Sequence, residues 1–109
     1  HIKYTCKEGR WNAGELVDVP YLNIHIAAKA LHYGQGAFEG FKAFRGGDGQ
    51  VRIFRPDKNA ERMRSTARRT FMVEVPTEPF VNAIKKVVTA NEEFFLPAAL
   101  AAPCIYDLC

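Results

Sequence analysis

The stretch that decides the fold is FEGFKAFRGGDGQVRIFRPD, residues 38–57. Two strand-length runs, Phe38–Arg45 and Gln50–Arg55, flank the glycine-rich loop Gly46–Gly49, a pattern typical of a β-hairpin. Proline and aspartate follow directly. Both suit the first turn of a helix, because proline loses no hydrogen bond there and aspartate favours the positive helix end. The stretch therefore predicts a hairpin that runs into a helix.

Two helices are predicted after this hairpin. The first has apolar residues at spacings of three and four, which is typical of a helix that faces a core; they are Ala60, Met63, Ala67 and Phe71. The second begins near Thr77, keeps one face to about Phe95, and is ended by Pro97. Its predicted inner face consists of Phe80, Ile84, Val87, Val88, Asn91 and Phe95.

The remaining segments are shorter. Residues 4–19 resemble a short hairpin around Glu8–Asn12, and the alanine-rich run His25–His32 predicts a short helix before Gly34. Residues 103–109 have the pattern of an opening strand. The order of hairpin, short helix, long hairpin, two helices and strand predicts an α+β fold in which two helices pack on a largely antiparallel sheet.

Composition and charge limit the size of the domain and the kinds of partner that the protein can have. The chain has 109 residues, of which 48% are hydrophobic and 25% charged, so it is one globular domain or part of a larger one. Lysine and arginine exceed aspartate and glutamate by 15 to 12, which is too small an excess to indicate a nucleic-acid partner. No apolar run approaches the roughly 18 residues that a membrane span needs. The missing start methionine predicts a fragment of a longer protein.

The cysteines and histidines do not form a recognisable site. Three cysteines, Cys6, Cys104 and Cys109, have no C-x-x-C spacing, and His25 and His32 lack ligand spacing, so we expect no metal. The odd count favours free thiols in a reducing compartment. We therefore expect a soluble intracellular protein, from the cytoplasm or a mitochondrion.

Two stretches are candidates for ligand binding. Gly34–Gly40 has the spacing G-x-G-x-x-x-G with a helix before it and a strand after it, which excludes the dinucleotide fingerprint. Its glycines allow close backbone approach to a ligand between Tyr33 and Phe38. A tight turn with core aromatics fits equally well.

The second candidate is the first predicted helix, which is rich in basic residues. Arg55, Arg62 and Arg69 are spaced seven apart beside its apolar stripe, so any of them can reach inward, and an arginine fork suits a phosphate monoester. A solvated basic face remains the plain alternative. The basic residues of the segment are Arg55, Lys58, Arg62, Arg64, Arg68 and Arg69.

Two longer stretches of sequence help to decide between these ligand-binding and structural interpretations. ALHYGQGAFEGFKAF at residues 30–44 and VRIFRPDKNAERM at residues 51–63 closely resemble branched-chain amino acid aminotransferases, and the resemblance runs from about Trp11 to Pro97. These are fold type IV enzymes that use pyridoxal 5'-phosphate. The resemblance implies that residues 1–109 are part of the small N-terminal domain of a two-domain subunit, usually a homodimer. Its substrates would be branched-chain amino acids and 2-oxo acids.

The resemblance also implies roles for single residues. Arg62 matches the arginine that holds the cofactor phosphate, whereas Arg64, Arg68 and Arg69 would face solvent or form structural pairs. The substrate-binding positions are matched by Tyr33, Phe38, Gly40 and Tyr106, and Lys42 has at most a supporting role. The family's cofactor-binding lysine lies in the C-terminal domain, which this chain lacks, so the chain holds no catalytic residue and is expected to be inactive alone.

One motif departs from the family pattern. The family continues into Tyr-x-Arg-Pro, but here Tyr106 is followed by Asp107, Leu108 and Cys109, so the arginine is missing. Two alternatives therefore stay open. One is another fold type IV enzyme, such as a D-amino acid aminotransferase or an aminodeoxychorismate lyase. The other is a non-catalytic fragment that binds anions through Arg55 to Arg69.

Overall fold

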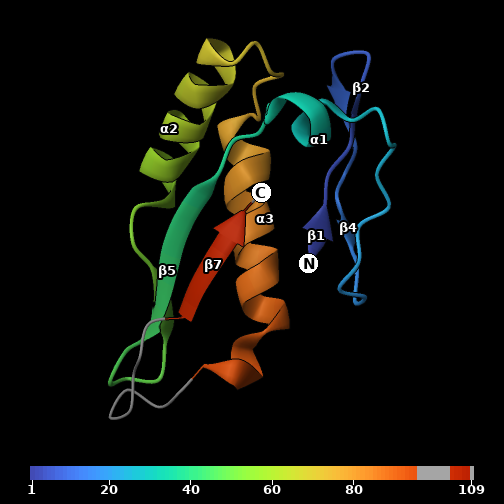
Figure 1. The fold of residues 1–109 in the computed structure, drawn as a ribbon. Coiled ribbons are helices and arrows are strands. Elements are labelled where there is room, and N and C mark those ends of the chain that lie inside the picture. The colour runs from blue at the N-terminus through green and yellow to red at the C-terminus, as the bar shows by residue number, and fades with distance from the viewer. Residues whose placement is uncertain (96–103, 109) are drawn as a thin grey trace.

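The computed structural model describes residues 1–95 and the backbone of residues 104–108. It is an α+β structure in which all strand pairs are antiparallel, as predicted. Two long helices lie on one side of a three-stranded sheet, and the N-terminal strands lie beyond the second helix (Figure 1). Pro97, predicted to end that helix, and Cys109 lie outside the described residues.

The sheet is organised around strand β5 (Glu39–Arg45). Strand β6 (Val51–Ile53) pairs with one edge of β5, with Ala43 opposite Ile53, which confirms the predicted hairpin. Strand β7 (Cys104–Leu108) pairs with the other edge, so the predicted terminal strand is also confirmed. The two neighbours pair with different halves of β5: β7 with Glu39 to Ala43 and β6 with Ala43 to Arg45, so each half of the strand is held by one partner.

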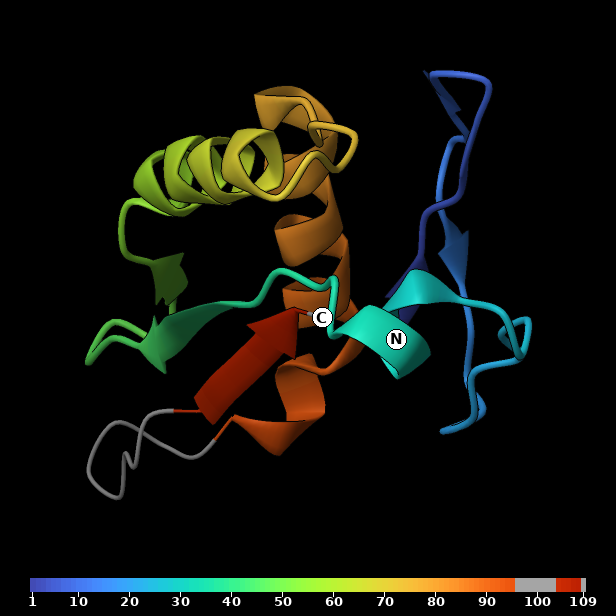
Figure 2. The ribbon, with the colours of Figure 1, turned by 45° about the horizontal axis from the view of Figure 1, so that its top comes forward.

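Two helices cover one face of this sheet. Helix α2 (Pro56–Arg69) and helix α3 (Thr77–Ala90) pack on each other, and α2 packs on β5 (Figure 2). The core between them is apolar, as expected for an α+β layer arrangement. Its buried members are Phe41, Ala43, Ala60, Met63, Phe80, Ile84, Val88 and Phe95.

The N-terminal segment forms one interrupted hairpin. Strand β1 (Ile2–Lys3) pairs with β4 (Glu15–Leu16), and β2 (Cys6–Lys7) pairs with β3 (Arg10–Trp11). Both turn residues between β2 and β3, Glu8 and Gly9, have positive φ angles, as a tight two-residue hairpin turn requires. A groove of about 720 Å³, lined in part by Leu22, separates this segment from α3. The indole of Trp11 donates to the Glu74 carbonyl at 3.2 Å and ties the hairpin to the helices.

Helix α2 ends earlier than its apolar periodicity predicts. Phe71, assigned to the core stripe, is exposed and has a φ of 55°. Its N–H donates to the Arg68 carbonyl, and Met72 N–H donates to the Ala67 carbonyl at 2.9 Å. These two bonds form a Schellman closure in which Phe71 occupies the left-handed position that glycine normally takes. The prediction for Phe71 is wrong because the sequence lacks that glycine signal.

Two further boundaries differ from the predictions. The short helix α1 covers Lys29–Tyr33 rather than His25–His32, because His25 instead caps a preceding turn, with its Nδ1 accepting from Ala27 N–H at 3.0 Å. Helix α3 ends at Ala90 and is followed by the 3₁₀ turn η1 (Glu92–Phe94). Phe95 is nevertheless buried, as predicted.

Among residues 1–95 and 104–108, no three His, Cys, Asp or Glu side chains are grouped to hold a metal ion. Within the same ranges, no helix combines the length and the apolar character needed to cross a bilayer.

The core assignment predicts a contrast between two phenylalanines. Phe80 is 5% exposed, whereas Phe94 is 67% exposed. Phe80→Ala should therefore lower the free energy of unfolding by about 3–5 kcal/mol, while the matched control Phe94→Ala should change it by no more than about 0.5 kcal/mol. Urea unfolding of both variants measures this. Equal losses would place the core elsewhere.

Candidate functional site

The candidate site begins with a buried carboxylate on β5. Residues alternate across a strand, so Glu39, Phe41 and Ala43 share the face that packs on the helices. Glu39 is 3% exposed and is the only buried charged residue among those described. Burial of an ionised carboxylate is costly unless the charge is paired and hydrogen-bonded. Partners for Glu39 are therefore required.

Helix α2 supplies these partners. Arg62 Nε donates to Glu39 Oε1 at 2.5 Å, and Arg62 Nη2 donates to Oε2 at 2.7 Å. Asn59 Nδ2 donates to the same Oε2 at 2.8 Å and to the Gly40 carbonyl at 3.0 Å. Arg62 and Asn59 are three residues apart, so both point from one side of the helix. The three hydrogen bonds satisfy the carboxylate and join α2 to β5.

The pair stays charged at neutral pH. The hydrogen bond from Arg62 lowers the pKa of Glu39 below its ordinary value of 4.5; burial opposes this, and the hydrogen bond from Asn59 adds to it. The same contact with Glu39 raises the pKa of Arg62. The arginine is therefore a permanent cation at a fixed place beside β5.

The structure places two of the proposed substrate residues next to this pair. Phe38 and Gly40 flank Glu39 in the chain, and Phe38 is 60% exposed. Because neighbouring strand residues point to opposite faces, Gly40 lies on the face of β5 away from the Glu39 carboxylate. Arg62 is thus held beside the segment from Phe38 to Gly40.

The other two proposed residues lie farther along the chain. Tyr33 is the last residue of α1 and is 84% exposed. Tyr106 lies on β7, where its Cα pairs with that of Phe41. This register brings the β7 backbone alongside the part of β5 that holds Gly40.

The glycine segment between α1 and β5 is anchored to α2. Gly34 ends α1 with a φ of 61°, a conformation that favours glycine. Gln35 Nε2 then donates to the Thr70 carbonyl at the end of α2, at 2.6 Å. The predicted order of helix, glycine turn and strand is confirmed, and the segment is tied to the same helix that carries Arg62.

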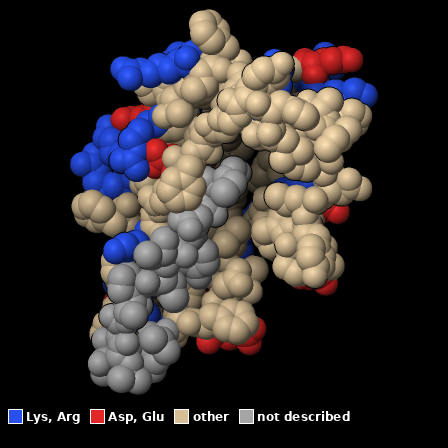
Figure 3. Space-filling view, viewed as in Figure 1, with Lys and Arg blue, Asp and Glu red and all other residues tan. Residues whose placement is uncertain are grey.

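Most of the basic residues of α2 have acidic partners, so the helix is not a free cationic surface. Figure 3 shows acidic side chains among the lysines and arginines in the region of α2. Lys58 pairs with Glu61 at 2.7 Å, and Glu74 accepts from both Arg64 at 3.0 Å and Arg68 at 3.3 Å. Arg64 and Arg68 therefore form structural pairs, as expected, and Arg69 is exposed.

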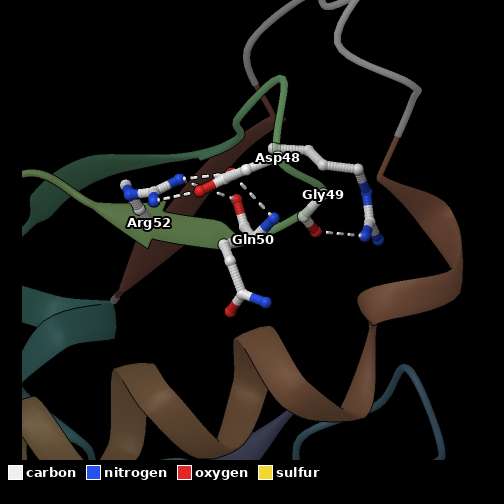
Figure 4. Close-up of polar contacts among 5 residues, drawn as sticks. Asp48, Gly49, Gln50 and Arg52 are labelled. Atoms are coloured by element: carbon white, nitrogen blue, oxygen red, sulfur yellow. Dashed lines mark hydrogen bonds and ion pairs between the residues drawn. The ribbon is translucent and has the colours of Figure 1, made fainter.

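The loop of the β5–β6 hairpin is stiffened by its own polar contacts (Figure 4). Arg52 donates to both carboxylate oxygens of Asp48, at 2.8 and 2.5 Å, and Gln50 N–H donates to Asp48 Oδ1 at 3.1 Å. These bonds hold the pKa of Asp48 well below its usual range. Arg45 donates to the Gly49 carbonyl and to the Glu92 carbonyl, both at 3.0 Å, and so connects the loop to η1.

Two members of the site were not predicted from the sequence. These are Glu39, which lies in the strand before the glycine-rich loop, and Asn59, which lies in the first turn of α2. The available signal was the period of two on β5, which places Glu39 on the same face as Phe41 and Ala43. A charged residue on a buried face requires a partner, and Arg62 had already been singled out as able to reach inward.

Comparisons with known proteins show that the chain is similar to aminotransferases. It is 52% identical to the branched-chain-amino-acid aminotransferase of Haemophilus influenzae over 84% of its length. It is 38% identical to that of Mycolicibacterium smegmatis over 89%, and 43% identical to the chloroplastic branched-chain-amino-acid aminotransferase 5 of Arabidopsis thaliana over 84%. No family model matches.

These proteins are homologues of the chain, which confirms the resemblance seen in the sequence. The chain is therefore related to transferases of amino groups. More specifically, the relatives named here are branched-chain-amino-acid aminotransferases. It spans about a quarter of their length: 26% of the two bacterial relatives and 22% of the plant one.

The charged pair predicts a pH dependence of stability. Because the folded-state pKa of Glu39 lies below 4.5, its contribution is complete above that pH and is lost as the pH falls through the folded value. Unfolding free energies should therefore fall more steeply below pH 4.5 for the native sequence than for Glu39→Gln. Urea titrations across this range measure the difference. Identical pH profiles would show that Glu39 is not charged in the folded state.

Proposed function

We propose that this chain forms part of the N-terminal domain of a fold type IV, pyridoxal-phosphate-dependent aminotransferase. The whole protein would transfer the amino group of leucine, isoleucine or valine to 2-oxoglutarate and would act as a homodimer. The homologues' names support the aminotransferase class. The observation that carries the proposal is Arg62, held by Glu39 beside the segment from Phe38 to Gly40.

The donors of Arg62 fit the phosphate of this cofactor. A guanidinium has five N–H groups, and Glu39 accepts from Nε and Nη2. The two N–H groups on Nη1 and the second N–H group on Nη2 remain free to donate to another anion. The Arg62 side chain is 67% exposed, so this outer edge is accessible. The planar guanidinium can therefore bind one anion on its Nε–Nη2 edge and a second on the neighbouring Nη1–Nη2 edge.

The residues around Arg62 would bind and orient rather than react. Phe38 offers an exposed aromatic surface to an aliphatic side chain and would exclude water from it. Gly40 would leave room beside that surface. Tyr33 would reach into the neighbouring subunit's site, near the substrate carboxylate. When bound, pyridoxal phosphate supplies an electron sink for the amino acid. The family's lysine would come from the C-terminal domain.

The non-catalytic anion-binding alternative is weakened by the ion pairs of α2. Lys58, Arg62, Arg64 and Arg68 each have a carboxylate partner. A helix whose charges are largely compensated attracts anions only weakly over long range. Specific binding at one oriented arginine is favoured instead.

The phosphate role predicts a cofactor defect in Arg62→Ala. In a full-length aminotransferase that contains this chain, the substitution should weaken pyridoxal phosphate binding about ten- to a hundredfold, or roughly 1.5–3 kcal/mol, because a charge-assisted contact is lost. Arg62→Lys should recover only part, since a point charge lacks the planar fork. The control is Arg68→Ala, on the same helix but paired with Glu74. Titration of the apo-protein with cofactor measures these affinities. A larger loss of affinity in Arg68→Ala than in Arg62→Ala would refute the phosphate role of Arg62.

The side-chain pocket predicts a change in specificity. Phe38→Ala in the same full-length protein should lower kcat/KM for leucine, isoleucine and valine. The loss corresponds to about 1–3 kcal/mol of transition-state binding. The loss for glutamate should be smaller, because its polar side chain gains less from an aromatic wall. Steady-state kinetics with the four amino acids test this. Equal losses for all four would remove Phe38 from the pocket.

A further inference from the structure

The Glu39–Arg62 ion pair fixes the orientation of the Arg62 guanidinium. Arg62 is exposed at its outer end, whereas its partner carboxylate is almost fully buried. An exposed arginine without a buried partner samples many rotamers, and ordering it costs free energy when it binds a ligand. Here Nε and Nη2 are both held, so the plane and direction of the guanidinium are fixed before any ligand arrives.

Glu39 is itself fixed by more than Arg62. Its backbone lies in the central strand, and Asn59 donates both to its carboxylate and to the Gly40 carbonyl beside it. The carboxylate therefore does not move with the arginine. The arginine takes its position from the carboxylate.

We infer that Glu39 is a positioning residue that orients Arg62 toward the phosphate group of the bound ligand. This inference rests on the proposed function, which assigns that phosphate to Arg62. Glu39 does not touch the ligand in this arrangement, because the guanidinium lies between them. Glu39 acts by holding the guanidinium so that its outer N–H groups point toward the phosphate.

An opposite electrostatic effect makes the inference easy to refute. The negative charge of Glu39 also repels a phosphate, so removing that charge would strengthen phosphate binding if orientation were unimportant. Orientation and repulsion therefore predict opposite signs for Glu39→Gln. The sign of the change in affinity decides between them.

The test uses full-length apo-protein and two probes, pyridoxamine 5'-phosphate and pyridoxamine, which lacks the phosphate. Glu39→Gln should weaken binding of the phosphorylated probe about two- to tenfold, the cost of ordering one flexible side chain. Binding of pyridoxamine should not change. Calorimetric dissociation constants give both values.

Two controls separate orientation from general charge effects. Glu61→Gln removes an exposed carboxylate from the same helix, where it pairs with Lys58, and should leave both probes unaffected. Glu39→Gln added to Arg62→Ala should cause no further loss, because Glu39 acts through Arg62. Glu39→Asp keeps the charge but shortens the side chain, and it should also weaken only the phosphorylated probe.

Each outcome is decisive. If Arg62→Ala weakens the phosphorylated probe but Glu39→Gln strengthens it or leaves it unchanged, the positioning role is refuted and the proposed function stands. If Arg62→Ala has no effect on that probe, the proposed function itself fails. If Glu39→Gln does not fold, Glu39→Asp tests orientation at constant charge, and an unchanged affinity for the phosphorylated probe in that variant overturns the inference.

Discussion

Burial of the Glu39 carboxylate between a central strand and a helix is the constraint that organises this molecule. A charged group at 3% exposure is tolerated only with partners, and Arg62 and Asn59 provide them from one side of α2. The apolar core brings α2 and β5 together, but apolar contacts alone allow some sliding. The directional bonds to Glu39 fix which part of α2 faces the segment from Phe38 to Gly40.

The rest of the scaffold keeps this contact rigid. The first half of β5 pairs with β7 and the second half with β6, and Arg45 ties the hairpin loop to η1 after α3. Gln35 connects the glycine turn to the end of α2, so the chain entering β5 and the helix covering it are joined at two places. Binding residues placed on such a supported frame lose little entropy when a ligand binds.

Sequence reasoning predicted the elements well where local signals were strong. The β5–β6 hairpin and the start of α2 followed from a glycine-rich loop and Pro56. The end of α2 was wrong because Phe71 adopts a glycine-like conformation without being glycine. Arg62 was singled out by its place beside the apolar stripe and by resemblance. Glu39 was missed although the period of two on β5 places it on the buried face with Phe41 and Ala43. What no local pattern contains is which residues of α2 lie opposite it, because that depends on how the helix packs on the sheet.

A crystal structure of the full-length protein with its cofactor bound tests the central claim most directly. The account predicts that Arg62 Nε and Nη2 still contact Glu39, while the outer guanidinium edge lies within about 3 Å of a phosphate oxygen. An Arg62 side chain that has left Glu39 to reach the phosphate would contradict the claim that the carboxylate positions it. A phosphate held elsewhere, with Arg62 in solvent, would contradict the site itself.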